Sequence, residues 1–505
     1  MINIASIREK SNKEKIGILF CAIGLLYLFI MTYIGLTKFG LWYDEIFSLI
    51  MIELPFGASI DRAIIDVHPP LYYVIYKVFY KLFVFIGFSD VAIVGKIVSL
   101  TPFYLLVALA FTKIKKNFGL LVAGLFTLCI TTMPQLMFYG VELRMYGWGL
   151  FFLTASFVYF YECIKSPNLK NWAILTILTI CSAYTHYFST IGAFLLYLLF
   201  LIYILFNNKS LIKNWLISSI IAVLSFIPWS FVLLNQFSTI HGDYWIYPIT
   251  HETIIHYVYF VLSPNDIFIK NNQLLTPTIL GTLFFIAILI LLIKSFMDRK
   301  EMEDNDKFKY YFSFMGILSL ILLISSGVII SLISSPIFHS RYMVPMLGCF
   351  WLGICILLSR FYSKKEIFIP IVALILIIGL VGTINFINIE ENEHQETIET
   401  NKVLNNFFKG GDVILHDNTK FVEHSGFYIK NNHHLNWHLD IGENVKNALE
   451  DPGIRGEINS GSKVYFVTTK QPNYEDCINH GIKLKRVDVD FEKAQECYIY
   501  EVIID

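Results

Sequence analysis

The chain has 505 residues, of which 55% are hydrophobic and 16% charged, and its mean hydropathy is +0.59. Soluble domains carry about 25% charged residues, so this composition is that of a membrane protein. The 39 basic and 40 acidic residues leave a net charge of −1, which gives no support for nucleic-acid binding.

Residues 16–36 form the first long apolar run, and the basic residues Arg8, Lys10, Lys13 and Lys15 precede it. The run is longer than the apolar part of a signal peptide, and no small-residue cleavage pattern follows it. We therefore expect a retained transmembrane helix. Its N-terminus is expected in the cytoplasm, because Lys and Arg concentrate on that side.

The segment 71–87 allows two interpretations. Tyr73, Tyr76, Lys77, Tyr80 and Lys81 recur at spacings of three and four, which predicts a polar stripe along an otherwise apolar helix. If the segment crosses the membrane, the basic cluster at 113–116 falls outside; if it lies on the outer surface, that cluster falls inside. The excess of Lys and Arg in cytoplasmic loops favours the second interpretation, so we expect 71–87 to lie in the membrane interface.

The same rule then places every later basic loop on the cytoplasmic side. A spanning helix needs about 20 apolar residues. The sequence therefore predicts an all-α polytopic membrane domain over 1–389, with interfacial helices in the first outer loop and about 11 transmembrane helices. The expected spans are 16–36, 91–112, 118–138, 146–164, 172–187, 189–206, 215–234, 274–293, 310–334, 342–359 and 367–387.

The composition changes beyond residue 390, and we expect a small extracytoplasmic α/β domain over 390–505. Cys477 and Cys497 are the only cysteines there; outside the cytoplasm they could pair, but their spacing alone does not establish the geometry. The runs typical of strands, separated by polar and glycine-bearing stretches, are 413–415, 464–467, 484–489 and 498–503.

The outer ends of the expected spans collect many polar residues. A carboxylate can activate an acceptor hydroxyl or amine as a base, and an arginine can hold the phosphate of a leaving group. No glycine-rich phosphate loop occurs, so no nucleotide site is indicated. Each residue alone also has a plainer interpretation, such as a solvated Asp44–Glu45 pair or an Arg341 that reaches lipid phosphates. The outer set is Asp44, Glu45, Asp66, His68, Glu142, Arg144, Tyr184, His186, Tyr187, His241, Asp243, Tyr244, Trp245, His251, Asp266, His339 and Arg341.

Five motifs in this order resemble those of the C-type membrane glycosyltransferases, which use polyprenyl-phosphate sugars. Within that group, the resemblance is to the protein O-mannosyltransferase and aminoarabinose transferase branch, and it covers about residues 1–390. The motifs are Trp42-x-Asp44-Glu45, then His68-Pro69-Pro70-Leu71-Tyr72-Tyr73, then Glu142-x-Arg144-x-Tyr146, then His186-Tyr187, and finally Arg341-Tyr342-x-x-Pro345.

The resemblance implies an enzyme that takes a sugar from a polyprenyl phosphate and inverts the anomeric carbon. It implies that Asp44 is the general base and that Glu142 orients the acceptor or the base. His68 stands where aminoarabinose transferases carry a lysine near the donor phosphate. Since a neutral histidine is a weaker anion partner than lysine, Lys77 or Arg341 could supply the charge.

The remaining expected substrate-binding residues follow from the same resemblance. The expected partners are a polyprenyl-phosphate sugar donor, membrane lipids and an acceptor that is an envelope lipid, glycan or protein. No cofactor is required, no metal ligands are assigned, and the participation of a divalent metal is left open, since some C-type enzymes use one. The expected substrate-binding residues are Glu45, His68, Tyr72, Lys77, Arg144, His186, Tyr187 and Arg341.

Two other functions are compatible with a multi-pass protein of the plasma membrane. A transporter or flippase of lipid-linked sugars would usually carry its essential charges near the bilayer midplane and often shows paired repeats. Here the charges lie at one surface, and no repeat is found. The second alternative is a non-catalytic membrane protein whose outer domain binds envelope glycans. The sequence favours the enzyme.

Overall fold

The computed structural model describes residues 4–239, 246, 248–261, 275–416, 433–436, 450, 452, 455, 461–468, 481–487 and 498–503. The chain forms two compact units. The membrane unit consists of Met1–Thr37 and Met51–Ile387, and the sheet unit consists of Lys38–Ile50 and Asn388–Asp505.

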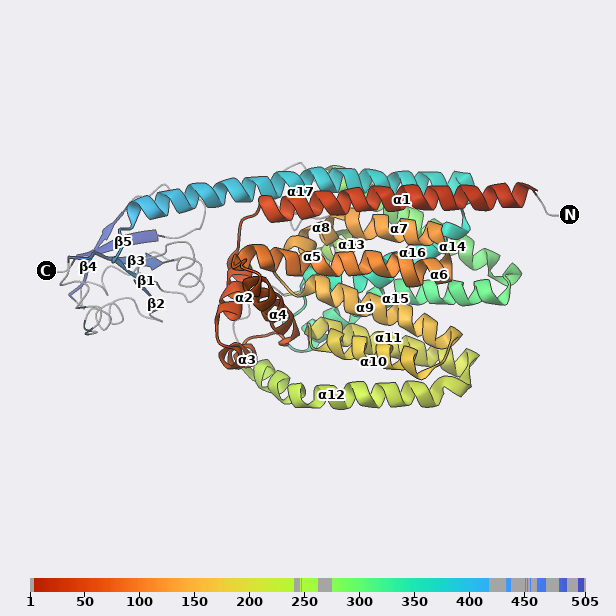
Figure 1. The fold of residues 1–505 in the computed structure, drawn as a ribbon, viewed down its shortest axis with the longest axis horizontal. Helices are drawn as coiled ribbons and strands as arrows, with labels where there is room; N and C mark the ends of the chain where they lie inside the picture. Colours follow the sequence, from red (N-terminus) through yellow and green to blue (C-terminus); the bar gives the residue numbers. More distant parts are fainter. Residues whose placement is uncertain are drawn as a thin grey trace. The chain divides into compact units, whose positions relative to one another are not determined.

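The membrane unit is built from long apolar helices that run beside one another (Figure 1). Its long helices, with the shorter α8, α10 and α13, are α1 (Ile4–Thr37), α5 (Val91–Leu109, continued by η1 Ala110–Ile114 and α6 Lys115–Phe118), α7 (Leu120–Thr132), α8 (Pro134–Val141), α9 (Tyr146–Lys165), α10 (Leu169–Ala183), α11 (Tyr187–Asn207), α12 (Ile212–Thr239), α13 (His251–Phe260), α14 (Leu275–Met297), α15 (Asp304–Ile333), α16 (Val344–Arg360) and α17 (Lys365–Phe407), the last of which continues into the sheet unit.

Within the described residues, nine helices are long and apolar enough to cross a membrane. A tenth span arises if α7 and α8, which are bent by 64° at their junction, count as one. Pro134 opens α8, and since proline lacks an amide N–H, the backbone hydrogen bonds of α7 cannot continue through it. The one remaining expected span, 172–187, corresponds to α10, an apolar helix of only 15 residues. The chain is therefore a multi-pass membrane protein, and the predicted fold class is confirmed.

The core of the membrane unit lies around α9 and α16, whose side chains are almost all buried, whereas most side chains of α12 are exposed. Small residues bring some helices into direct contact. A Cβ added to Gly124 of α7 would overlap the carbonyl oxygen of Gly17 on α1, so these two helices pack backbone against backbone. Close approach at small residues is the usual way in which helices associate inside a bilayer.

Two short helices lie at one end of the membrane unit: α3 (Phe56–Ile65) and α4 (Leu71–Phe85) (Figure 1). Of the polar stripe predicted on α4, Tyr73, Tyr76 and Lys77 are buried against the protein. The opposite face of α4 exposes apolar side chains, including Leu82 and Phe85. An exposed apolar face beside transmembrane helices suits a helix that lies in the interface.

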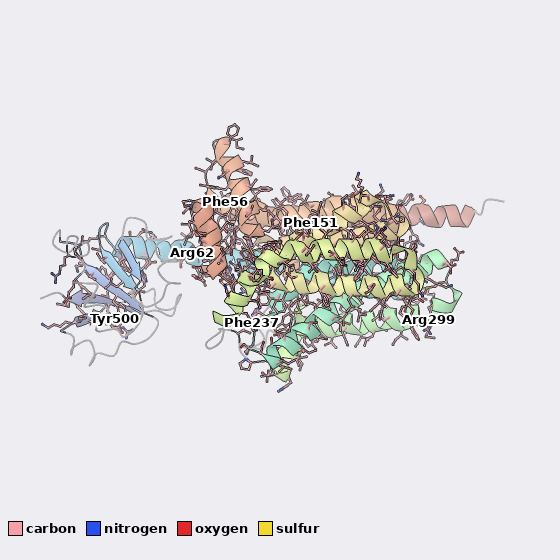
Figure 2. All side chains as sticks on the ribbon, turned by 90° about the horizontal axis from the view of Figure 1, so that it is seen from below. Phe56, Arg62, Phe151, Phe237, Arg299 and Tyr500 are labelled. Carbon is pink, nitrogen blue, oxygen red and sulfur yellow. The ribbon has the colours of Figure 1, made fainter. Side chains whose placement is uncertain are left out.

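Figure 2 shows the two ends of the membrane unit. Phe237 near the end of α12 and Arg62 of α3 lie at one end, and Arg299, in the short η4 turn (Asp298–Glu301), lies at the other. The η4 turn, at the end opposite the interfacial helices, contains Arg299 and Lys300 together with Asp298 and Glu301. The orientation of the termini across the membrane stays a prediction.

The sheet unit begins with the last twenty residues of α17, from Asn388 to Phe407, and contains a five-stranded sheet in the order β2-β1-β3-β5-β4. β1 pairs in parallel with β2 and β3, and β5 pairs antiparallel with β3 and β4. Leu404 and Phe408 pack against the sheet, and this core confirms the predicted α/β domain. Cys477 and Cys497 lie outside the described residues. The strands are β1 (Val413–His416), β2 (His433–Asn436), β3 (Val464–Thr468), β4 (Lys483–Arg486) and β5 (Tyr498–Ile503).

The segment that carries Asp44 and Glu45 belongs to the sheet unit. Residues 38–50 group with that unit, although they precede the rest of it by more than 300 residues in the chain. They include the start of α2 (Tyr43–Glu53), and Asp44 and Glu45 lie in its first turn. The sequence analysis had assigned this segment to the membrane domain.

Candidate functional site

Four separate stretches of the membrane unit meet at the end where α3 and α4 lie. They are the α3–α4 loop, the turn between α8 and α9, the start of α11, and η5 (Ser340–Met343). The amide of Leu71 donates to the carbonyl of Tyr184 at 3.0 Å, which ties the start of α4 to the turn before α11. Residues far apart in the sequence therefore share one site.

Asp66 and His68 form a pair in the α3–α4 loop. The distance between Asp66 Oδ2 and His68 Nδ1 is 3.3 Å, and the Tyr73 hydroxyl donates to the same carboxylate oxygen at 3.5 Å. Burial alone would raise the pKa of Asp66, but the hydrogen bond and charge of His68 and the charge of Arg144 lower it below its usual value. The ionised Asp66 carboxylate accepts from His68, which keeps a proton on Nδ1 of that ring.

His186 caps the N-terminus of α11. Its Nδ1 accepts a hydrogen bond from the amide of Phe188 at 3.1 Å, so a proton on the neutral ring sits on Nε2. Its ring centroid lies 5.5 Å from that of His68 and 4.8 Å from that of Tyr342. Burial, together with the charges of His68, Arg341 and Arg144, lowers the pKa of His186 well below its usual value. His186 is therefore a neutral hydrogen-bond donor.

Two arginines are buried at the same place. Arg144, in the turn after α8, is 4% exposed, and Arg341, in η5, is 8% exposed. The Arg341 guanidinium lies 5.9 Å from the ring centroid of Tyr146 and 5.7 Å from that of Tyr342, which limits the directions it can take. A planar guanidinium in a desolvated site is the preferred protein partner of a phosphate group, because its fork of donors matches two oxygens.

A cavity of about 360 Å³ lies beside this cluster. Its lining is almost entirely apolar and comes mostly from α11 and α12, and the side chains of His68 and His186 also line it. Leu234 in this lining is 66% exposed, so the cavity reaches the outer surface of the helix bundle. The lining residues are Val67, His68, His186, Tyr187, Phe188, Thr190, Ile191, Leu233, Leu234, Gln236, Phe237, Ile337 and Tyr342.

Gln236 is a residue of this site that the sequence analysis did not identify. Its amide nitrogen donates to the carbonyls of Ala63 and Ile64 at 3.0 and 2.9 Å, and its amide oxygen accepts from the Tyr187 hydroxyl. These bonds join α12 and α11 to the end of α3, directly before the Asp66–His68 pair. The only signal in the sequence was an amide side chain at the end of an apolar helix, where polar residues usually have a function.

The other predicted residues occupy different positions. The Lys77 ammonium donates a hydrogen bond to the carbonyl of Leu54. This bond fixes the backbone directly after α2. Tyr72 packs on Tyr73, with ring centroids 5.5 Å apart, and it is Tyr73 that bonds to Asp66. Glu142 ends α8 and its carbonyl accepts from the amide of Arg144 at 2.7 Å.

Among the residues that the structure describes, no three His, Cys, Asp or Glu side chains are grouped so that they could hold a metal ion.

No family model and no curated protein matches the sequence. The crystal structure of ArnT from Cupriavidus metallidurans in the apo state is 12% identical and aligns with a TM-score of 0.60, over 96% of this chain and 97% of that chain. ArnT from the same organism bound to undecaprenyl phosphate aligns with a TM-score of 0.57, at 12% identity and over the same shares. An oligosaccharyltransferase from Archaeoglobus fulgidus aligns with a TM-score of only 0.44, at 11% identity, over 88% of this chain and 67% of that chain.

The alignment with ArnT extends over nearly the whole of both chains, including the C-terminal region. The fold expected from the five sequence motifs is thereby confirmed. The chain has the C-type glycosyltransferase fold of the aminoarabinose transferase ArnT.

Proposed function

We propose that the protein is an integral-membrane glycosyltransferase that moves a sugar from a polyprenyl-phosphate donor to a cell-envelope lipid, glycan or protein on the outer face of the plasma membrane. One observation carries this proposal: two buried arginines and the Asp66–His68 pair lie beside a largely apolar cavity. The ArnT structure with undecaprenyl phosphate supports the same class of donor for this fold.

The donor phosphate would be held by Arg341 and Arg144. Both guanidiniums are desolvated, and interactions between charged groups are stronger where water is excluded. His186 and His68 add hydrogen-bonding groups where their side chains line the cavity. The first apolar units of the lipid would lie against Leu233 and the neighbouring apolar lining.

The transfer would proceed by direct displacement with inversion. Asp44 takes the proton from the acceptor hydroxyl or amine, and the acceptor oxygen or nitrogen forms a bond to the anomeric carbon. The bond from that carbon to the phosphate oxygen breaks, and polyprenyl phosphate leaves with the bonding electrons. The arginines stabilise the additional negative charge that develops on the phosphate. Glu142 orients the acceptor, and Glu45 contributes to substrate binding in the first turn of α2.

The experiment that tests this function uses purified protein in lipid nanodiscs and a panel of polyprenyl-phosphate sugars. Mass spectrometry follows the release of polyprenyl phosphate and the glycosylated product. We expect one donor to be consumed and Asp44→Asn to abolish transfer, with the Asp44→Asn protein still folded. The matched control is Asp61→Asn, because Asp61 is exposed on α3 and the same change there leaves transfer unchanged.

Near-normal transfer by Asp44→Asn would refute its assignment as the base. If no donor in the panel is consumed but lipid-linked sugar moves between the leaflets of a proteoliposome, the transporter alternative is correct. Binding of envelope glycans without either activity would favour the non-catalytic alternative.

A further inference from the structure

Within the sheet unit, the chain before α2 lies against α17. The carbonyl oxygen of Phe39 and Nδ1 of His394 are 3.0 Å apart, so His394 donates a hydrogen bond to the backbone of this segment. The Lys38 ammonium lies 3.4 Å from the Glu391 carboxylate. This ion pair is largely exposed and contributes little by itself. The backbone contact with His394 is therefore the more important of the two.

Gly40 makes this contact a close one. A Cβ at position 40 would lie 2.7 Å from Thr397 Oγ1 and 3.1 Å from the carbonyl oxygen of Glu393. Thr397 is three residues after His394 and four after Glu393, so it lies on the same face of α17 as both of them. The segment follows this face, and only a residue without a side chain fits at position 40.

The contact is next to the start of α2. The amide of Trp42 donates to Glu45 Oε2 at 3.3 Å, and the Trp42 carbonyl accepts from the amides of Glu45 and Ile46 at 3.0 and 3.1 Å. The Ser48 hydroxyl donates to the carbonyl of Asp44 at 3.0 Å. The first turn that carries Asp44 is thus internally bonded and begins three residues after Gly40. A fixed position for residues 38–40 therefore also fixes the position at which α2 begins.

The other end of this part of α17 is anchored in the sheet. Leu404 and Phe408 are buried in one core with Ile414, Tyr465 and Ile499. From residue 388 to residue 407 the helix is continuous, and a helix transmits a displacement of one end to contacts along its length. The sheet is therefore connected to residues 38–40 through α17, and a displacement of the sheet would change the position of these residues.

We propose that His394 is a positioning residue for the transfer reaction: through Phe39, and with the close contact at Gly40, it sets the orientation of the helical turn that carries Asp44. This inference rests on the proposed function, since it assumes that Asp44 is the base. It assigns a role to α17 and the sheet, which affect turnover through the position of Asp44.

The test compares three variants on α17 of the full chain in nanodiscs. His394→Ala removes the hydrogen-bond donor, His394→Asn keeps a donor nitrogen near the place of Nδ1, and Glu396→Gln is the control because Glu396 is exposed on the same helix. We expect His394→Ala to lower kcat by about tenfold or more, because small displacements of a catalytic group are costly, with KM and the Kd for polyprenyl phosphate within about twofold. His394→Asn recovers most of the rate, and Glu396→Gln matches the wild type.

A second pair of variants tests the same contact without changing His394. Gly40→Ala forces the segment away from α17 and lowers kcat in the same way. Thr397→Ala removes the oxygen that the new methyl group would strike, so the double variant Gly40→Ala/Thr397→Ala recovers part of the rate while Thr397→Ala alone retains it. This pair keeps the test valid if His394→Ala fails to fold.

Hydrogen exchange of residues 38–50 gives a measurement that does not depend on activity, and we expect it to rise in His394→Ala and Gly40→Ala. Unchanged exchange in both variants would overturn the inference, because the contact would not hold the segment. Raised exchange with unchanged kcat would also overturn it. Full transfer by Asp44→Asn would instead contradict the proposed function, so the two failures are distinguishable.

Discussion

Replacing Arg341 should weaken donor binding more than any other single change in the membrane unit. Its guanidinium is 8% exposed and lies within 6 Å of the ring centroids of Tyr146 and Tyr342. A hydrogen bond to a charged group contributes about 1.5–3 kcal/mol, and each 1.4 kcal/mol is a factor of ten, so Arg341→Gln should raise the Kd for polyprenyl phosphate roughly 10- to 150-fold. Arg341→Lys keeps the charge but loses the planar fork, so an intermediate loss is expected.

In the assay, undecaprenyl phosphate is titrated into detergent-solubilised protein, and calorimetry measures the heat of binding, from which the Kd is obtained. Arg299→Gln is the matched control, because Arg299 lies at the opposite end of the membrane unit (Figure 2). Thermal melting without ligand checks that each variant is folded. A folded Arg341→Gln protein whose Kd stays within twofold of the wild-type value would refute the assignment of Arg341 to the phosphate.

Two further predictions concern the cavity. Gln236→Leu leaves the carbonyls of Ala63 and Ile64 without their amide partner, and unsatisfied buried groups cost about 1–3 kcal/mol each, so we expect a lower Tm and a higher KM for the donor. A differential melting scan checks the first effect; an unchanged Tm contradicts the role of Gln236. Ile191→Trp fills part of the apolar lining of the cavity, so the Kd for a polyprenyl phosphate should rise while that for inorganic phosphate stays constant. Equal changes in the two Kd values would contradict the assignment of this cavity to the lipid.

Much of the fold could be predicted from the sequence because the bilayer imposes simple rules. Apolar length identified the spans, and the basic loops resolved the ambiguous segment 71–87. The motifs around His68, His186 and Arg341 predicted residues that the fold brings together. Those residues are recognisable because charged and polar groups at the end of a span are unusual enough to stand out.

The features that could not be predicted depend on long-range contacts. The bond from Gln236 to Ala63 connects residues 173 positions apart, and no local pattern indicates it. β2 (His433–Asn436) contains no β-branched residue, so its sequence does not favour a strand, and its pairing with β1 decides its structure. The stripe on α4 was recognised correctly, but its burial follows from the helices that surround it.

The small size of the cavity has a consequence for substrate selection. About 360 Å³ is near the lower limit for sites that enclose a whole small ligand, and an undecaprenyl chain is far larger. The exposed Leu234 in its lining leads outward to the surface of α12. A lipid donor that used this route would leave most of its tail among the bilayer lipids, so the protein would discriminate poorly between isoprenoid carriers of different length and would sample them by lateral diffusion from the leaflet.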